Sequence, residues 1–222
     1  MGLELPGGST TEHELNLIKD VLLSYDNAGS FLEVGCHTGR LIYYLHMFCP
    51  NWKYTGVDPW DEIVMWVAND ISTSIEKVQK EFGVSVRHCN TNYRLVSVVS
   101  FYNLKQAKEI NEYIVKNKLG TSITEEFFKS NCPFANSYKM KFENYKSTEK
   151  FDVISFGAIG SRLDCTLLFK KAKLYLKPDG VFIGRFFNSA NYGLKIRTAL
   201  ETLNWKPEVI DEETGAFIVR NL

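Results

Sequence analysis

Residues 30–39 read Ser-Phe-Leu-Glu-Val-Gly-Cys-His-Thr-Gly and predict the fold of the chain. A short apolar run ends here in glycine, and apolar residues at helical spacing follow from Leu41 to Phe48. This pattern is typical of a strand, a tight turn and a helix. Residues 52–59 then read Trp-Lys-Tyr-Thr-Gly-Val-Asp-Pro, which indicates a second strand that ends at its proline. Because a helix lies between them, the two strands are expected to pair in parallel.

The C-terminal third of the chain alternates strand and helix in the same way. Before residue 30, Leu15, Ile18 and Leu22 recur at helical spacing after a run of N-cap hydroxyls, which predicts a further helix. The pattern indicates an α/β fold with a Rossmann-like, doubly wound, mostly parallel sheet and a C-terminal antiparallel hairpin. The elements expected in the last third are a strand at 151–156, a helix at 163–176, a turn at 177–180, a strand at 181–187, a helix at 192–203 and hairpin strands at 208–211 and 216–220.

The third strand of the sheet has two candidate segments, because residues 60–137 hold more chain than one crossover helix uses. Residues 84–88 and residues 138–142 both alternate as strands do. We favour residues 138–142, since Glu143 then stands only eight residues before the next strand.

We expect residues 1–222 to form a single domain with an insertion or cap at about 61–123. Sheets of this kind bind ligands at the carboxyl ends of their strands, and we expect the insertion to lie beside that end. Helices are predicted in this part of the chain at 71–82 and 124–131, and the insertion is expected to hold strand-like and helical pieces that include residues 103–118.

The composition argues against several classes of protein. The 222 residues are 45% hydrophobic, enough for one full core, and 26 basic residues balance 26 acidic ones, so the positive field of a general nucleic-acid binder is lacking. No apolar stretch approaches the roughly 20 residues of a membrane span. The first residues lack the basic start and the long apolar core of a secretory signal. The five cysteines form no Cys-x-x-Cys pair, which argues against a disulfide framework or a zinc knuckle. We expect a cytoplasmic protein with no nucleic-acid or membrane partner.

Three residues around the first two strands predict a nucleoside pocket. Gly35 and Gly39 lie in the turn between strand and helix, where the missing side chains let a ligand approach the backbone. The helix that follows offers unpaired N–H groups at its N-terminus. Asp58 ends the second strand about 20 residues further on, where a carboxylate can accept both hydroxyls of a ribose. Without the acid, the two glycines would be explained more simply as structural. The carboxylate of Asp58 at this place makes a nucleoside pocket the better explanation.

At these residues the sequence resembles the class I S-adenosylmethionine-dependent methyltransferases. Their first motif is an acid followed by Gly-x-Gly-x-Gly or a relaxed form, and residues 33–39 match the relaxed form with His37 in place of the middle glycine. Residues 56–60 resemble the second motif, residues 151–154 the fourth, and residues 176–181 the turn before the fifth strand. Within the superfamily, the likeness leans toward small-molecule O-methyltransferases of the macrocin type.

The resemblance implies S-adenosylmethionine as the cofactor and a small molecule as the methyl acceptor. The binding residues that it implies are Glu33 for the methionyl amino group, Gly35, His37 and Gly39 beside the methionyl chain, Asp58 for the ribose hydroxyls, Pro59 and Trp60 on the adenine, Glu143 or Asn144 at the adenine edge, and Phe156 and Gly157 beside the sulfonium and the acceptor.

A general base is useful for a hydroxyl acceptor, and the chain offers several candidates. The catalytic candidates are His37 and Asp164, followed by His88 and Asp70. Each has a structural alternative: His37 as a polar residue that tolerates the turn, Asp164 as a charge at a helix N-terminus, and the other two as exposed or structural side chains.

The departures from the family pattern argue against a metal. Metal-dependent relatives carry an Asp at the end of the fourth strand and an Asp-Asn or Asp-Asp pair after the fifth, where this chain has Gly157 and Arg185-Phe186. Base-methylating enzymes carry Asn/Asp-Pro-Pro-Tyr/Phe after the fourth strand, where residues 156–159 read Phe-Gly-Ala-Ile. The resulting hypothesis is a metal-independent O-methyltransferase for a small molecule.

Three rival functions stay open. A non-catalytic cofactor-binding or scaffolding protein of the same fold is favoured by the missing acid at the fourth strand and by the absence of an obvious base. A dinucleotide-dependent oxidoreductase would need glycines where His37 and Arg40 stand, and an aminopropyl transferase would show acids near Gly157. Aromatic residues make up 14% of the chain; we expect most in the core, with an acceptor pocket or a homo-oligomer interface as alternatives.

Overall fold

The computed structural model of the chain describes residues 12–26, 28–60, 64–90, 93–99, 103–156, 164–185, 190–211 and 215–220. The chain divides into two units. Among the described residues, the sheet unit contains residues 12–36, residues 41–58, and those from residue 134 onward. The inserted unit contains residues 37–40 and 59–133. The expected place of residues 61–123 beside the ligand end of the sheet stays a prediction.

The sheet unit is built on a seven-stranded sheet with the order β10-β11-β9-β8-β1-β2-β7. The pairs β7–β2, β2–β1, β1–β8 and β8–β9 are parallel, whereas β11 is antiparallel to both β9 and β10. This confirms the predicted doubly wound, mostly parallel sheet and its C-terminal hairpin. The strands are β1 (Ser30–Val34), β2 (Lys53–Asp58), β7 (Asn136–Lys139), β8 (Phe151–Phe156), β9 (Leu176–Arg185), β10 (Glu208–Asp211) and β11 (Ala216–Arg220).

Strand order reverses between β1 and β8. The chain passes from β1 outward through β2 to β7, and then returns to β8 on the other side of β1. In open α/β sheets, ligands bind outside the carboxyl ends of the strands at such a reversal. The strand order therefore places the expected ligand end at the carboxyl ends of β1, β2 and β8.

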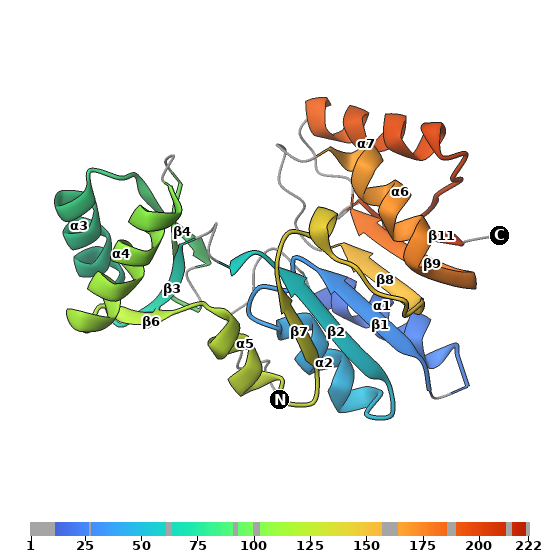
Figure 1. Cartoon of the computed structure of the whole chain (residues 1–222), viewed down its shortest axis with the longest axis horizontal. Helices are drawn as coiled ribbons and strands as arrows, with labels where there is room; N and C mark the ends of the chain where they lie inside the picture. Colours follow the sequence, from blue (N-terminus) through green and yellow to red (C-terminus); the bar gives the residue numbers. More distant parts are fainter. Residues whose placement is uncertain are drawn as a thin grey trace. The chain divides into compact units, whose positions relative to one another are not determined.

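Helices cover both faces of this sheet (Figure 1). One face is buried under α6 (Cys165–Tyr175) and α7 (Ala190–Thr202), and the other under α1 (Glu12–Leu23) and α2 (Arg40–Phe48). The core on the α6 and α7 side joins strand residues such as Leu32 and Phe182 to Phe169 and Leu200 on the helices. All four helices lie within a few residues of their predicted positions.

The third strand comes from the favoured segment of the sequence. β7 pairs with β2 from Asn136, opposite Thr55, to Lys139, opposite Asp58. The strand covers residues 136–139, so it begins and ends earlier than the predicted strand at 138–142 but overlaps it. It ends early because residues 142–144 form a short 3-10 helix, η2 (Phe142–Asn144). Apolar alternation runs on through Phe142, whose ring is buried from this helical turn rather than from a strand.

The predicted turn at 177–180 lies inside β9. The register between β8 and β9 shifts between Phe151, opposite Leu176, and Val153, opposite Val181. Asp179 takes a left-handed backbone conformation with φ 63°. The sequence Lys-Pro-Asp-Gly therefore forms an irregularity within a continuous strand, not a loop before it.

The inserted unit has an antiparallel four-stranded sheet with the order β4-β5-β3-β6. A separate apolar core joins Trp66 and Val96 in this sheet to Val78 and Ile110 on the helices beside it. The predicted helices are confirmed, and residues 84–88 overlap β4 of this sheet. The elements are β3 (Met65–Ala68), α3 (Ile71–Phe82), β4 (Val86–Asn90), β5 (Leu95–Val98), α4 (Leu104–Lys116), β6 (Gly120–Ser122) and α5 (Glu125–Asn131). In the described part of the chain, no helix is long and apolar enough to cross a bilayer.

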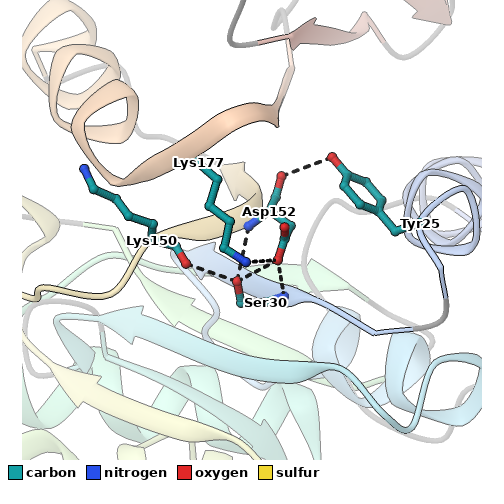
Figure 2. Close-up of polar contacts among 5 residues, drawn as sticks. All are labelled: Tyr25, Ser30, Lys150, Asp152 and Lys177. Atoms are coloured by element: carbon teal, nitrogen blue, oxygen red, sulfur yellow. Dashed lines mark hydrogen bonds and ion pairs between the residues drawn. The ribbon is translucent and has the colours of Figure 1, made fainter.

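A polar cluster joins the amino ends of β1 and β8 (Figure 2). The Oδ2 atom of Asp152 accepts hydrogen bonds from the backbone N–H of Ser30 at 2.7 Å, from the Ser30 hydroxyl at 2.9 Å and from Nζ of Lys177 at 2.7 Å. The Tyr25 hydroxyl donates to the Asp152 carbonyl at 3.3 Å. Burial raises the pKa of Asp152, but the hydrogen bonds from Lys177 and Ser30 outweigh it and leave that pKa below its ordinary value. This carboxylate is a structural link at the end of the sheet away from the expected ligand.

Candidate functional site

Two buried carboxylates lie on one face of the sheet at the carboxyl ends of β1 and β2. Glu33 pairs with Gly56 across the two strands, and Asp58 stands two residues beyond Gly56. Because side chains alternate along a strand, Glu33 and Asp58 point to the same face. Their exposed fractions are only 5% and 4%. The strand register thus brings together the two acids that the sequence singled out.

The surroundings of Glu33 leave part of its carboxylate without a partner. Burial raises the pKa of Glu33 well above its ordinary value, and the negative charge of Asp58 raises it further. The backbone N–H of Ile42, in the first turn of α2, donates to Glu33 and partly opposes this rise. The Oε2 atom of Glu33 has no hydrogen-bond partner among the residues that the structure describes. A buried acceptor of this kind favours a ligand that brings a cation or a hydrogen-bond donor.

Gly35 gives this site an open backbone. Its φ of 79° lies in the left-handed region, and a Cβ atom built there would meet nothing within 4 Å. Its N–H donates to the Val57 carbonyl at 2.8 Å, which fixes the turn to the end of β2. The space left by the missing side chain is therefore not filled by packing, as expected for close approach of a ligand.

The second half of the turn has partners in the inserted unit. Gly39 has a φ of 80°, and a Cβ atom there would lie 2.7 Å from Sγ of Cys132 and 3.0 Å from the Phe128 ring. The indole N–H of Trp60 donates to the His37 carbonyl at 2.8 Å. Sequence reasoning missed these contacts, because no local pattern marks a cysteine and a phenylalanine so far along the chain. The expected contacts of Gly39 with a methionyl chain and of Trp60 with adenine stay predictions.

The candidate bases differ in their surroundings. Burial lowers the pKa of His37 to about 4, so its imidazole is neutral at pH 7. Asp164 accepts from the backbone N–H of Leu167 at 3.1 Å, and Asp70 accepts from that of Thr73 at 2.7 Å. Asp164 is thus the N-cap of α6, which confirms its alternative as a charge at a helix N-terminus, and Asp70 has a structural role as the N-cap of α3. His88 is exposed on β4. A catalytic role for any of the four stays a prediction.

The remaining predicted residues lie at the ends of β7 and β8. Phe156 ends β8, and its ring is buried in the core with the rings of Phe169 and Phe182. Glu143 and Asn144 lie in η2. Gly157 lies outside the described residues. Pro59, directly after β2, is half-buried.

Lys171 is a residue near the site that sequence reasoning missed. It lies on α6, and its Nζ donates to the Glu143 carbonyl at 2.5 Å. The same ammonium lies over the rings of Phe142 and Tyr175, 5.6 Å and 5.9 Å from their centroids. A lysine on a helix gives no sign in the sequence of such a contact. Among the described residues, no group of three or more His, Cys, Asp or Glu side chains is placed to hold a metal ion.

Comparison with known proteins gives one family and a set of related folds. A family model described as a methyltransferase domain matches residues 12–217. No curated protein matches the sequence. The structure is similar to that of CalS10, an amino pentose methyltransferase from Micromonospora echinaspora bound to SAM, with a TM-score of 0.54, 8% sequence identity and coverage of 97% of this chain and 93% of that one.

Two further solved structures are similar to this chain. The first is an O-methyltransferase from Bacillus cereus in complex with SAH, with a TM-score of 0.52, 12% identity and coverage of 97% of this chain and 83% of that one. The second is a precorrin-6y C5,15-methyltransferase from Geobacter metallireducens, with a TM-score of 0.51, 12% identity and coverage of 96% and 89%. At these identities, the similarity concerns the fold.

Proposed function

The chain belongs to the methyltransferase-domain family, and we propose that it transfers the methyl group of S-adenosylmethionine to a small molecule. The observation that carries this proposal is the pair of buried carboxylates, Glu33 and Asp58, on one face at the carboxyl ends of neighbouring strands. The cofactor brings an ammonium group and two ribose hydroxyls, which are donors for such acceptors.

The residues of the sheet unit fit this cofactor. The Oε2 atom of Glu33, which lacks a partner among the described residues, suits the methionyl ammonium, whose charge would favour the ionised carboxylate. Asp58 ends β2 at the place of a ribose-binding acid. The open space beside Gly35 suits the methionyl chain. The similar structures of CalS10 with SAM and of the Bacillus cereus enzyme with SAH support the same choice of cofactor.

The protein's part in the reaction is mainly alignment. When bound, S-adenosylmethionine supplies an electrophilic methyl group on a sulfonium, so the protein needs chiefly to hold the acceptor in line with it. A base with a pKa of about 4 removes a proton slowly at neutral pH, so we propose that neutral His37 orients an acceptor hydroxyl by hydrogen bonding.

The finer assignments rest on the sequence. O-methylation by a member of the macrocin-type branch is proposed from the motif resemblance, and the named O-methyltransferase among the similar structures supports it. Metal independence is proposed because Gly157 and Arg185-Phe186 replace the acids that metal-dependent relatives carry. We also propose a cytoplasmic location, from the five scattered cysteines that form no Cys-x-x-Cys pair, and no nucleic-acid partner, from the balanced charge.

Calorimetry with S-adenosylmethionine, S-adenosylhomocysteine and NAD tests the proposal. We expect the first two to bind and NAD not to bind. Asp58→Ala should weaken both by more than about tenfold, because the ribose loses a charged acceptor. Asp20→Ala removes an acid from an exposed position on α1 and serves as the control. Binding of NAD alone, or of none of the three, would overturn the proposal.

Transfer itself is tested by screening acceptors for release of S-adenosylhomocysteine, with and without EDTA. Turnover that survives EDTA supports metal independence. Tight cofactor binding without turnover on any acceptor class would favour the non-catalytic alternative.

A further inference from the structure

The turn between β1 and α2 packs with the inserted unit, although both elements that flank it belong to the sheet unit. Residues 37–40 group with residues 59–133. The backbone carbonyls of this turn accept hydrogen bonds from residues further along the chain, Trp60 and Cys132.

Trp60 holds the first residue of this segment. His37 has a φ of 49°, a left-handed conformation that a residue with a side chain adopts only at a cost in energy. The indole N–H of Trp60 donates to the His37 carbonyl at 2.8 Å, and only 3% of Trp60 is exposed. The Trp60 ring in turn packs against Phe128 at a centroid distance of 5.5 Å. A rigid, buried donor therefore supports the strained residue.

The contacts at Gly39 and Arg40 come from two other segments of the inserted unit. Sγ of Cys132 lies 3.4 Å from the Gly39 carbonyl and donates to it, and Cys132 is fully buried just after α5. The guanidinium of Arg40 lies over the Tyr93 ring, 5.4 Å from its centroid. Together with Trp60, these residues contact three of the four residues of the segment.

We propose that the inserted unit sets the conformation of residues 37–40 through Trp60 and Cys132, and thereby sets the affinity of the protein for its cofactor. In this role both are positioning residues: they act on the backbone of the turn, which is separate from the predicted contact of Trp60 with adenine. If the turn visits other conformations, cofactor affinity falls in proportion to the fraction of molecules with a competent turn. The part concerning affinity rests on the proposed function, whereas the part concerning the turn does not.

The test compares Trp60→Phe with Trp66→Phe. Phenylalanine keeps an aromatic face at position 60 and removes only the indole donor and some volume. Trp66 is a matched control, because it is fully buried in β3 and its Nε1 has no hydrogen-bond partner among the described residues. Both variants lose the same atoms, but only Trp60→Phe removes a hydrogen bond to the turn.

Two measurements are made on each variant. In the ligand-free protein, we expect faster backbone hydrogen exchange at residues 37–41 in Trp60→Phe and no change there in Trp66→Phe. In calorimetry, we expect S-adenosylhomocysteine to bind Trp60→Phe about tenfold more weakly than Trp66→Phe. Equal exchange and equal affinity in the two variants would overturn the inference. If the wild-type protein binds no S-adenosylhomocysteine, the proposed function fails, and hydrogen exchange still decides whether Trp60 holds the turn.

A double-mutant cycle tests Cys132 and remains informative if Trp60→Phe does not fold. Gly39→Ala introduces a Cβ atom 2.7 Å from Sγ of Cys132, and Cys132→Ala removes that sulfur. We expect the double variant to bind S-adenosylhomocysteine more tightly than Gly39→Ala alone, because the shortest contact, with the sulfur, is relieved while the 3.0 Å contact with the Phe128 ring and the strain at φ 80° remain. Strictly additive effects on affinity and on hydrogen exchange would show that Cys132 does not act on the turn.

Discussion

Asp152 and Glu33 lie near opposite ends of neighbouring parallel strands, and their carboxylates have opposite surroundings. Asp152 accepts three hydrogen bonds on one oxygen, and its pKa is lowered. Glu33 is more deeply buried, faces a second acid, and has one oxygen without a partner among the described residues. A satisfied carboxylate contributes to folding, whereas an unsatisfied one destabilises the ligand-free protein and favours a ligand. The comparison therefore separates a structural end of the sheet from a binding end.

The largest effect is expected at the structural end. Asp152→Ala removes the carboxylate oxygen that accepts from the Ser30 backbone N–H and from Lys177, and should lower the free energy of unfolding by about 3 kcal/mol. For a chain of this size, that corresponds to a fall in Tm of about 6–12 °C. Differential scanning calorimetry measures it. Affinity for S-adenosylhomocysteine should stay unchanged at a temperature where the variant is folded. A large loss of affinity without a fall in Tm would reverse the assignment of the two ends.

The converse effect is expected at the binding end. Glu33→Gln removes a buried charge beside Asp58, so Tm should stay the same or rise, whereas affinity for S-adenosylhomocysteine should fall about tenfold. Methylthioadenosine, which lacks the amino-acid part, serves as the control ligand. Its affinity should not change in Glu33→Gln but should fall in Asp58→Ala. Equal losses for both ligands in Glu33→Gln would mean that Glu33 does not contact the amino group.

The two acids that define the binding end were predictable from the sequence because their signals are local. The apolar run before Gly35 predicts β1, and the proline after Asp58 marks the end of β2. Alternation along paired strands then places Glu33 and Asp58 on one face. The first strand, its turn and its helix could therefore be predicted with nearly correct boundaries.

The partners of the turn and the end of the third strand could not be predicted, because long-range contacts determine them. The segment 37–40 has an ordinary glycine-turn sequence, but Trp60 and Cys132 determine what its carbonyls bind. Phe142 continues the apolar alternation of a strand and is nevertheless part of a 3-10 helix, where Lys171 binds the neighbouring carbonyl. Periodicity reports which face is buried and does not report where backbone pairing stops.

The opposite pKa shifts give the two acids opposite effects on stability as pH changes. Folding raises the pKa of Glu33, so its contribution is full below its ordinary value of 4.5 and is lost as pH rises toward the folded value. Folding lowers the pKa of Asp152, so its contribution is present above 3.8 and is lost as pH falls through the folded value. We expect the Tm of the ligand-free protein, measured in thermal melts from pH 3 to pH 8, to show both effects.

Two variants, Glu33→Gln and Asp152→Asn, separate the contributions of the two acids to the change of Tm with pH. The difference in Tm between wild type and Glu33→Gln should change above pH 4.5, and the difference between wild type and Asp152→Asn should change below pH 4. These changes should be smaller than the loss in Asp152→Ala at neutral pH, since each concerns one proton. A Glu33→Gln difference that is flat with pH would contradict the raised pKa.

The smallest effect is expected at η2, the short helix that follows the carboxyl end of β7. Lys171→Met removes the donor to the Glu143 carbonyl and keeps an unbranched side chain beside Phe142. Lys173→Met is the matched control on the same helix, because Nζ of Lys173 contacts the Leu203 carbonyl at 3.5 Å and lies 5.8 Å from the centroid of the Trp205 ring, instead of contacting Glu143 and Phe142. If Glu143 or Asn144 meets the adenine edge, Lys171→Met should weaken S-adenosylhomocysteine and adenosine alike by about threefold. Unchanged adenosine affinity would remove η2 from the site and leave the binding end to the two acids. A threefold loss in Lys173→Met as well would show a general effect of charge, because the two variants change the net charge equally.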